Sequence, residues 1–148
     1  MSDAILAGRF KVHDIQSIQG RLACALEEAM QQAKRSKKTL FAHGAVVWSG
    51  NRIYAVGCNQ PRCVRFSRIT SEGTLFDNSG HAEMMALSRL QETETSLSLL
   101  VVRWRRKGSL GLSRPCEMCM PKLMARSGLA RVYWSLNENQ IVEMRIER

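Results

Sequence analysis

Apolar residues recur at helical spacing between residues 15 and 35, in the stretch "IQSIQGRLACALEEAMQQAKR". Positions spaced three and four residues apart fall on one face of a helix, so this stretch predicts an amphipathic helix with one buried side. A basic run, "KRSKK", follows and suits the partial negative charge at a helix C-terminus. The residues that form the predicted apolar face are Ile15, Ile18, Leu22, Ala25, Leu26, Ala29 and Met30.

Four later segments are rich in β-branched and aromatic residues and predict strands. "TLFAHGAVVWS" and "RIYAVGCN" are joined by "SGN", a tight-turn signal, and we expect them to form a hairpin. "SLSLLVVRWRR" predicts a buried strand with a charged end, and "LARVYWSL" predicts another strand. The tail "NQIVEMRIER" fits either a last strand or a short helix.

Two shorter helices and one long loop complete the expected elements. Residues 80–91 predict a helix, and residues 116–128 predict a second one that Gly128 closes. Because Pro121 would interrupt a helix interior, we expect a short turn to carry the two cysteines and the helix to restart near Pro121. Residues 59–79 predict a polar loop, and loops of this length often have a function.

The element order is α, β, β, α, β, α, β, which indicates the α/β fold class. Strands that alternate with helices favour a mixed sheet covered by helices on both faces, a three-layer α/β/α arrangement. Parallel β-α-β crossovers are expected in the second half of the chain. With 148 residues and no linker-like segment, we expect a single domain over residues 1–148.

Composition and charge narrow the classes of function. No apolar run approaches the roughly 20 residues that cross a bilayer, and the first residues lack a signal-peptide pattern, so we expect a soluble, cytoplasmic or other intracellular protein without membrane contact. The net charge of +9 favours a polyanionic partner or a phosphorylated substrate, although a solubilising surface charge would look the same. Five cysteines without a signal peptide suggest reduced thiols and a metal site.

One imidazole and two thiols lie where predicted helices begin. His81 opens "HAEMMAL", and Cys116 and Cys119 form Cys-x-x-Cys in "SRPCEMC". The positive end of a helix favours thiolates, and two sulfurs with one nitrogen select zinc over magnesium or calcium. Three protein ligands leave one tetrahedral position open for water, which is typical of a catalytic zinc site. The alternatives are a structural zinc clip and, for His81 alone, a helix-start or core histidine.

Glu83 lies two residues after His81, on the first turn of the same predicted helix. It can approach a zinc-bound water without ligating the ion. Zinc lowers the pKa of that water towards about 7, and the carboxylate then takes its proton. We therefore expect Glu83 to be the general acid and base of the site.

"SGHAEMMAL" and "SRPCEMC" resemble the cytidine deaminase-like superfamily, whose signature is H-x-E followed by P-C-x-x-C. Its members include cytidine and deoxycytidylate deaminases, tRNA adenosine deaminases and polynucleotide cytosine deaminases. The resemblance covers roughly residues 15–136. It implies a five-stranded sheet between helices and the hydrolytic removal of an exocyclic amine, with His81, Cys116 and Cys119 holding Zn²⁺ and Glu83 moving protons.

The resemblance also implies substrate contacts at Asn59, Ala82 and Pro115, although Asn59 could be a turn residue and Ala82 a small helix-start residue. The segment "HGAVV" is similar to the family's first strand, which lines the pocket. Arg114 departs from the acidic residue common before this proline in tRNA-type enzymes, which counts against that branch. Small deaminases of this kind are often homo-oligomers, and we expect the same here.

The substrate remains open between two classes at this point. We expect a cytosine-type nucleoside or nucleotide, and the alternative is a cytosine or adenine within single-stranded DNA or RNA, including tRNA. A third hypothesis, a non-catalytic zinc-stabilised interaction domain, is disfavoured by Glu83. Cations interleaved with an aromatic residue in "RWRRK" are typical of single-strand binding, and a solvated strand end would carry them too. The candidate phosphate or nucleic-acid contacts are Arg62, Arg65, Arg68, Arg103, Trp104 and Arg105.

Overall fold

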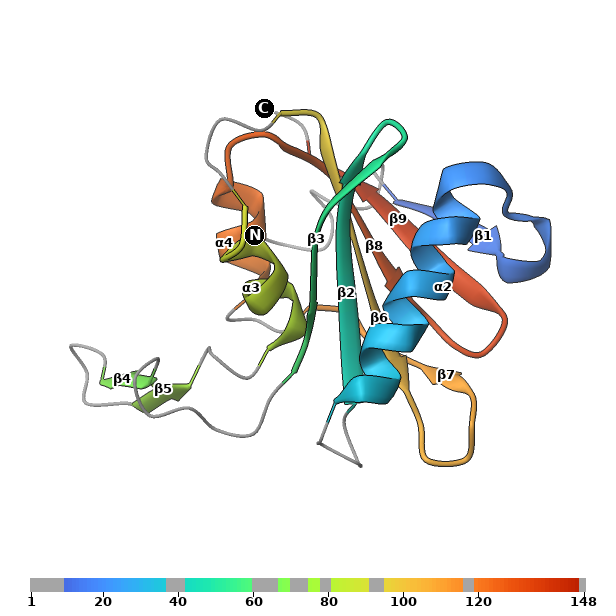
Figure 1. Ribbon diagram of the computed structural model, residues 1–148, viewed down its shortest axis with the longest axis horizontal. Helices are drawn as coiled ribbons and strands as arrows, with labels where there is room; N and C mark the ends of the chain where they lie inside the picture. The colour runs from blue at the N-terminus through green and yellow to red at the C-terminus, as the bar shows by residue number, and fades with distance from the viewer. Residues whose placement is uncertain are drawn as a thin grey trace.

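The computed structural model describes residues 10–36, 42–59, 67–69, 75–77, 81–90, 95–115 and 119–146. Its centre is a seven-stranded mixed sheet in the order β1-β9-β8-β6-β2-β3, with β7 paired to β6 (Figure 1). The helices are α2 (Gly20–Arg35), α3 (Ala82–Leu87) and α4 (Cys119–Ala125). The strands of this sheet are β1 (Phe10–Asp14), β2 (Ala42–Ser49), β3 (Arg52–Cys58), β6 (Leu97–Trp104), β7 (Leu110–Gly111), β8 (Leu129–Ser135) and β9 (Gln140–Arg145).

The expected hairpin and the expected parallel crossover are both confirmed. β2 and β3 pair antiparallel up to Ser49 and Arg52, and the two-residue turn between them uses Gly50 at a φ of 59°, a conformation that suits glycine. β6 and β8 pair in parallel, and α4 lies in the connection between them. The tail is a strand, β9, which pairs antiparallel with β8 and resolves the choice left open by its sequence.

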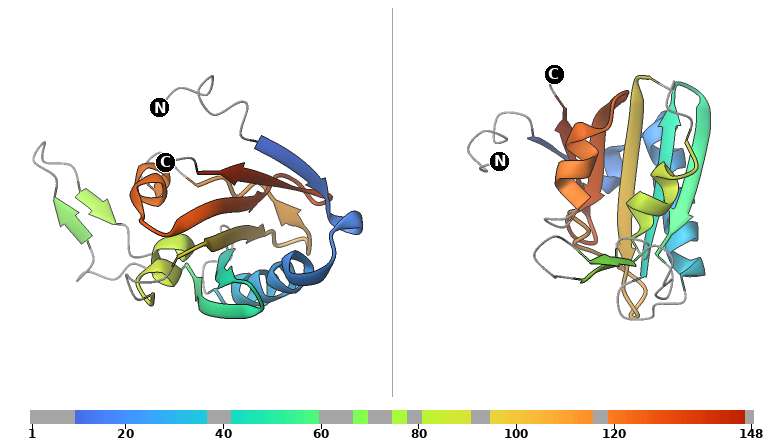
Figure 2. Two further views of the ribbon diagram at one scale, coloured as in Figure 1. Left: turned by 90° about the horizontal axis from the view of Figure 1, so that it is seen from above. Right: turned by 90° about the vertical axis from the view of Figure 1, so that its left-hand side faces the viewer.

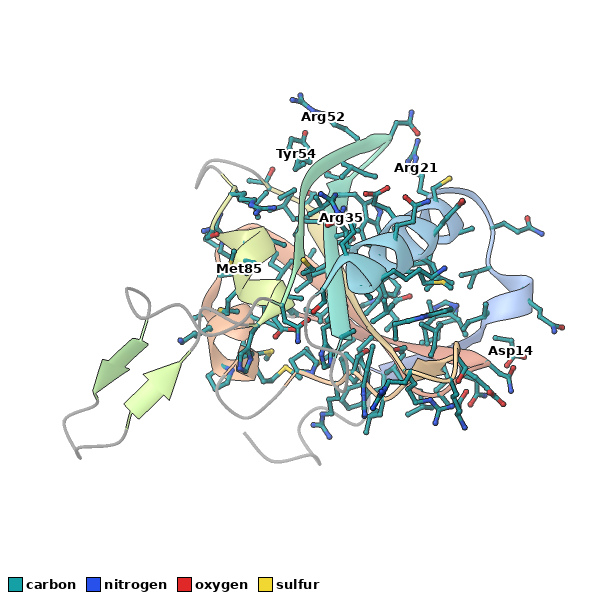
Figure 3. The ribbon with its side chains drawn as sticks, turned by 60° about the horizontal axis from the view of Figure 1, so that its bottom comes forward. Asp14, Arg21, Arg35, Arg52, Tyr54 and Met85 are labelled. Carbon is teal, nitrogen blue, oxygen red and sulfur yellow. The ribbon has the colours of Figure 1, made fainter. Side chains whose placement is uncertain are left out.

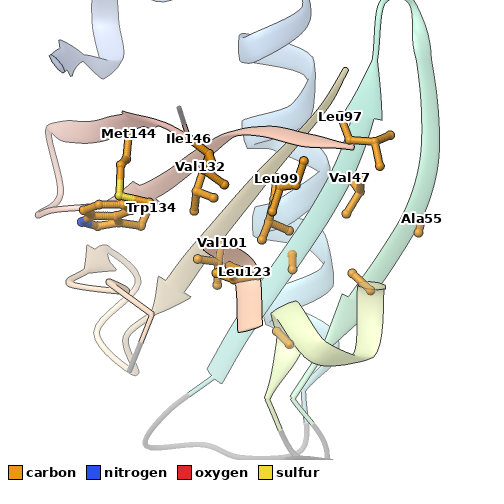
Figure 4. Packing of buried hydrophobic residues seen from close by; sticks show 14 of the residues in the cluster. Val47, Ala55, Leu97, Leu99, Val101, Leu123, Val132, Trp134, Met144 and Ile146 are labelled. Atoms are coloured by element: carbon orange, nitrogen blue, oxygen red, sulfur yellow. The ribbon is translucent and has the colours of Figure 1, made fainter. Parts of the chain in front are cut away.

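Helices cover both faces of the sheet, which confirms the three-layer α/β/α class. Alternate strand residues point to opposite faces. Val46, Leu100 and Val102 pack with α2, whereas the intervening residues pack with α3 and α4 (Figure 4). In the right-hand view of Figure 2, α3 and α4 lie in front of the sheet and α2 lies behind it. The buried residues on the face of α3 and α4 include Val47, Leu99, Val101, Leu123, Val132 and Trp134.

Two glycines let the helices approach the sheet closely. A Cβ added to Gly44 in β2 would lie 2.1 Å from the carbonyl oxygen of Ala29 in α2. A Cβ added to Gly57 in β3 would lie 2.7 Å from the backbone nitrogen of Ala86 in α3. Both distances are shorter than any real Cβ contact, so α2 and α3 reach these positions only because the strand residues have no side chain.

Several sequence expectations are wrong in extent. The sheet has seven strands where five were expected, because β1 and the short β7 extend it. The segment expected as a polar loop contains β4 (Ser67–Ile69) and β5 (Leu75–Asp77), which form a separate two-stranded sheet. The helix expected from residue 15 begins at Gly20, after a single 3-10 turn over Ile15–Ser17.

The two shorter helices are also shorter than expected. α3 ends at Leu87, and α4 ends at Ala125. Cys119 and Pro121 both lie within α4. The expectation that a short turn carries both cysteines is therefore wrong for Cys119, and Cys116 lies outside the described residues. Among the described helices, none combines the length and the apolar composition needed to cross a membrane.

Candidate metal centre

The candidate site residues lie at one end of the sheet. α3 begins directly after His81, and α4 begins at Cys119. β3 ends and β2 and α3 begin at the lower end of the molecule in Figure 1, and Figure 3 turns this end towards the viewer. Side chains from segments far apart in the sequence therefore meet where the two helices of one face start.

His81, Glu83 and Cys119 form a cluster whose ligand atoms all lie within 4.8 Å of one another. His81 Nδ1 lies 3.0 Å from Cys119 Sγ and 3.6 Å from Glu83 Oε1. The carboxylate is buried, with 8% of the side chain exposed, whereas 34% of the His81 side chain is exposed. A buried carboxylate requires a compensating partner, which a cation bound by this cluster would provide.

Local structure explains how this cluster forms. His81 is the residue before α3, in extended conformation, and its carbonyl accepts the Met85 N–H at 3.0 Å, the first hydrogen bond of the helix. Its side chain can therefore turn back towards α4, and Glu83 follows on the first turn. Gly57 has no side chain and therefore allows α3 to lie close to β3. This close approach helps to set the distance of His81 and Glu83 from the sheet.

A row of polar residues, formed by Asn59, His43 and Arg103, crosses the sheet on the face that α3 and α4 cover. His43 pairs with Arg103 across β2 and β6. Residues 45, 47, 99 and 101 pack on the face of α3 and α4, so the strand pleat places the side chains of His43 and Arg103 on that face as well. Asn59 adjoins His43, because its N–H donates to the His43 carbonyl at 3.2 Å. The sequence reasoning did not single out His43, although it lies in the strand segment that resembles the family's pocket wall.

The carboxamide of Asn59 is held in place by hydrogen bonds. Its Oδ1 accepts the His43 N–H at 2.9 Å and the Ser36 hydroxyl at 2.5 Å. The same hydroxyl also lies 2.8 Å from the Asn59 carbonyl oxygen. Asn59 is 5% exposed, and its hydrogen bonds with Ser36 join the end of β3 to the residue that follows α2. A contact between Asn59 and substrate stays a prediction.

A buried serine pair anchors the segment that leads to the cysteines. The Ser113 and Ser135 hydroxyl oxygens lie 2.7 Å apart. Ser113 Oγ also donates to the Val101 carbonyl at 2.7 Å, and Ser135 Oγ donates to the Gly111 carbonyl at 2.6 Å. These bonds join the ends of β6 and β8 to residues 111–113. Pro115, two residues further on, is buried. Sequence reasoning missed this pair because a buried serine has no recognisable pattern.

The other residues that the sequence singled out lie partly within and partly outside the described residues. Cys116, Arg62 and Arg65 lie outside the described residues, and of Arg68 only the backbone is described. Ala82, at 1% exposure, packs in the core beneath the site. The indole of Trp104 lies under Lys34, whose Nζ is 4.5 Å from the ring centroid. Base stacking on Trp104 stays a prediction, and it would compete with this cation–π contact.

The described residues fit a zinc ion. Typical zinc bonds are about 2.0 Å to histidine nitrogen and about 2.3 Å to cysteine sulfur, so atoms that share an ion lie no more than about 4.3 Å apart. The separation of 3.0 Å between His81 Nδ1 and Cys119 Sγ satisfies this limit. An imidazole nitrogen and a thiol favour zinc over the hard cations. Cys116, which lies outside the described residues, stays a predicted second sulfur ligand.

Fold and site together define an α/β protein with a metal centre between the starts of two helices. The chain matches the model of the cytidine and deoxycytidylate deaminase zinc-binding region over residues 21–136, and it belongs to this family of zinc-dependent deaminases. Zn²⁺ is the cofactor that both the family and the His, Glu and Cys cluster indicate. No curated protein and no solved structure matches the chain significantly.

Proposed function

We propose that the protein hydrolytically deaminates a cytosine-type nucleoside or nucleotide, converting cytosine to uracil. The observation that carries this proposal is the buried Glu83 carboxylate beside His81 and Cys119 in a chain of the deaminase family. A purely structural zinc clip would not need a buried carboxylate next to its ligands. In this proposal His81, Cys116 and Cys119 hold the ion.

When bound, zinc lowers the pKa of water so that hydrolysis proceeds near neutral pH. Glu83 then moves the protons. Its carboxylate takes one proton from the attacking water and gives it to the ring nitrogen next to the amine-bearing carbon. It next carries the second proton of that water to the amine, which leaves as ammonia. One carboxylate serves both transfers because it is buried and cannot exchange its proton freely with solvent.

Asn59, Ala82 and Pro115 orient the substrate in this proposal. The Asn59 carboxamide oxygen is held by Ser36 and His43, so its amide group is a rigid donor for a sugar hydroxyl or a base edge. In this proposal the buried Ala82 and Pro115 bring backbone to the two sides of the base, Ala82 from the start of α3 and Pro115 from the segment before Cys116. Rigid positioning of this kind lowers the entropic cost of reaching the reactive geometry.

Replacing Glu83 by glutamine tests the proposal. Glu83→Gln keeps the size of the side chain but cannot carry a proton, so we expect zinc content to be unchanged and ammonia release to fall by about 10²- to 10⁴-fold. Zinc-replete protein is assayed for ammonia with cytidine, deoxycytidine and their 5′-monophosphates. Glu27→Gln, an exposed position on α2, is the matched control and should retain full activity. Near-normal turnover by Glu83→Gln would exclude this mechanism.

A base within single-stranded nucleic acid is the second candidate substrate. Its support is the net charge of +9 and the exposed cations Arg106 and Lys107 at the end of β6. The same ammonia assay with cytosine- and adenine-containing oligonucleotides distinguishes it from the first candidate. Ammonia release from oligonucleotides but not from nucleosides or mononucleotides would assign the protein to the deaminases that act on polynucleotides.

A further inference from the structure

A pocket of about 510 Å³ opens at the end of the sheet, beyond the polar row. Its walls come from the end of β6, from β7 and from the turn between β8 and β9. The lining residues that matter for its chemistry are Arg103, Arg105, Leu112, Leu136, Asn137 and Glu138. None of the described metal-centre residues lines it. Arg103 and Arg105 are candidate phosphate contacts from the sequence, whereas no residue of the turn between β8 and β9 was expected to contact substrate.

The Arg103 and Arg105 side chains lie on the same face of the sheet as the candidate metal centre, whereas the lining residue Leu110 packs in the core cluster under α2. Arg103 is shared by the polar row and the pocket, and it pairs with Gly111 across β6 and β7. A Cβ on Gly111 would lie 2.9 Å from Arg105 Cδ, so the Arg105 side chain lies across Gly111 on that face. Leu136, another lining residue, packs against the core cluster under α3 and α4. The pocket therefore continues the row that begins at Asn59.

The chemistry of the pocket favours an anion. Two guanidinium groups line it, and Arg105 Nε is buried without a hydrogen-bond partner among the described residues. Arg105 Nη2 donates to Ser109 Oγ at 2.9 Å, which fixes the orientation of the Arg105 guanidinium group. The acidic residue that lines the pocket, Glu138, lies 3.8 Å from Arg105 and is 56% exposed, so water screens this pair. Guanidinium groups bind phosphate oxygens in a fixed, two-pronged geometry.

We propose that this pocket binds the phosphate group of the substrate, so that the protein acts on a phosphorylated cytosine nucleotide in preference to the free nucleoside. This inference rests on the proposed deaminase function and names its substrate class. The base would lie at the metal centre beside Asn59 and His43, and the phosphate would lie against Arg103 and Arg105. Arg103, which pairs with His43 and also lines the pocket, would lie between the base and the phosphate.

The specificity ratio tests the phosphate subsite. We compare kcat/KM for cytidine 5′-monophosphate and deoxycytidine 5′-monophosphate with kcat/KM for the two nucleosides. The wild type should prefer the monophosphates, and Arg105→Gln should reduce this preference by about 10- to 100-fold, as expected for hydrogen bonds to a charged group. Arg145→Gln removes the same charge from an exposed position on β9 that does not line the pocket, so the preference should stay within about twofold. Arg105→Lys should restore part of the loss.

Binding of the product gives a readout that does not require turnover. By titration calorimetry, uridine 5′-monophosphate should bind the zinc-loaded wild type more tightly than uridine, and Arg105→Gln should abolish the difference. Equal binding of the two, or a preference that Arg105→Gln leaves intact, overturns the phosphate subsite while the deaminase function stands. Absence of ammonia from every cytosine substrate overturns the deaminase function, and the calorimetry still decides the subsite.

A third measurement, with cytosine-containing oligonucleotides, distinguishes the phosphate of a mononucleotide from a phosphate within a strand. A phosphate within a strand would make the oligonucleotide the preferred substrate and would make Arg105→Gln weaken its binding. A preference for the mononucleotide over the oligonucleotide assigns the pocket to a terminal phosphate.

Discussion

At the scale of single residues, the metal centre combines side chains with two different roles, metal binding and proton transfer, within a few ångströms of one another. His81 and Cys119 are 3.0 Å apart and offer the nitrogen and sulfur that zinc prefers. Glu83 is 3.6 Å from His81 and buried, and its role in the proposal is to move protons. Loss of a ligand and loss of the carboxylate should therefore have separable effects.

Cys119→Ser should abolish stoichiometric zinc binding and lower the thermal stability, because a hydroxyl is a poor replacement for a thiolate ligand. His81→Ala and Cys116→Ser should have the same effect. Elemental analysis of the purified variants measures zinc per chain, with about one expected in the wild type. Cys24→Ser is the control, since Cys24 is exposed on α2 and should leave the zinc content unchanged. Full zinc occupancy in both His81→Ala and Cys119→Ser would contradict the ligand assignment.

The spacing of His81, Glu83 and Cys119 made the cluster predictable from sequence, because reactive residue types at helix starts form a recognisable pattern. His81, Glu83 and Cys119 do lie together in the structure, whereas the third predicted ligand, Cys116, lies outside the described residues, so the ligand set stays a prediction. His43 and Ser113 could not be found in this way. Their placement depends on strand register, on the pleat and on a buried hydrogen bond, and a single histidine or serine in a sequence carries none of that information.

At the scale of elements, strongly periodic segments were predicted well and their ends were not. The β2–β3 hairpin and the β6-α4-β8 crossover follow from turn residues and apolar runs. β1 and β7 lacked a detectable signal, since β7 has only two residues and forms because it pairs with the end of β6. α3 ends at Leu87, before the end that its apolar pattern predicted.

Gly57→Ala tests how strongly the position of α3 depends on its close approach to β3. The added Cβ would lie 2.7 Å from the Ala86 nitrogen, and backbone cannot yield as a flexible side chain does. We expect a loss of about 1–3 kcal/mol in unfolding free energy, together with weaker zinc binding. Chemical denaturation and a zinc-competition assay measure the two effects.

Gly50→Ala is the matched control for this substitution. Its positive φ should cost roughly 1–2 kcal/mol of stability, but its added Cβ meets nothing within 4 Å. Because the hairpin turn is remote from α3, zinc affinity should not change. Equal zinc affinity in Gly57→Ala and Gly50→Ala would show that the approach of α3 to β3 does not set the geometry of the centre.

At the scale of the whole molecule, the net charge of +9 is compatible with both candidate substrates, and the structure sharpens how they differ. Arg103 and Arg105 line a pocket, whereas Arg106 and Lys107 are exposed on the same hairpin. A mononucleotide offers one phosphate and would use the pocket alone. A strand would also engage the exposed cations, and each neutralised phosphate would release condensed counterions.

The salt dependence of binding separates these two cases. If the substrate is a mononucleotide, replacing Arg106 and Lys107 together by glutamine should leave its kinetics almost unchanged, because exposed cations are already satisfied by water. Oligonucleotide affinity, measured against salt for the wild type and the double variant, should then have a shallow slope in both. For a strand substrate the wild-type slope would be steep, at about −0.7 per contact, and loss of two contacts would flatten it by about 1.4 units. That outcome would overturn the preference for a small-molecule substrate.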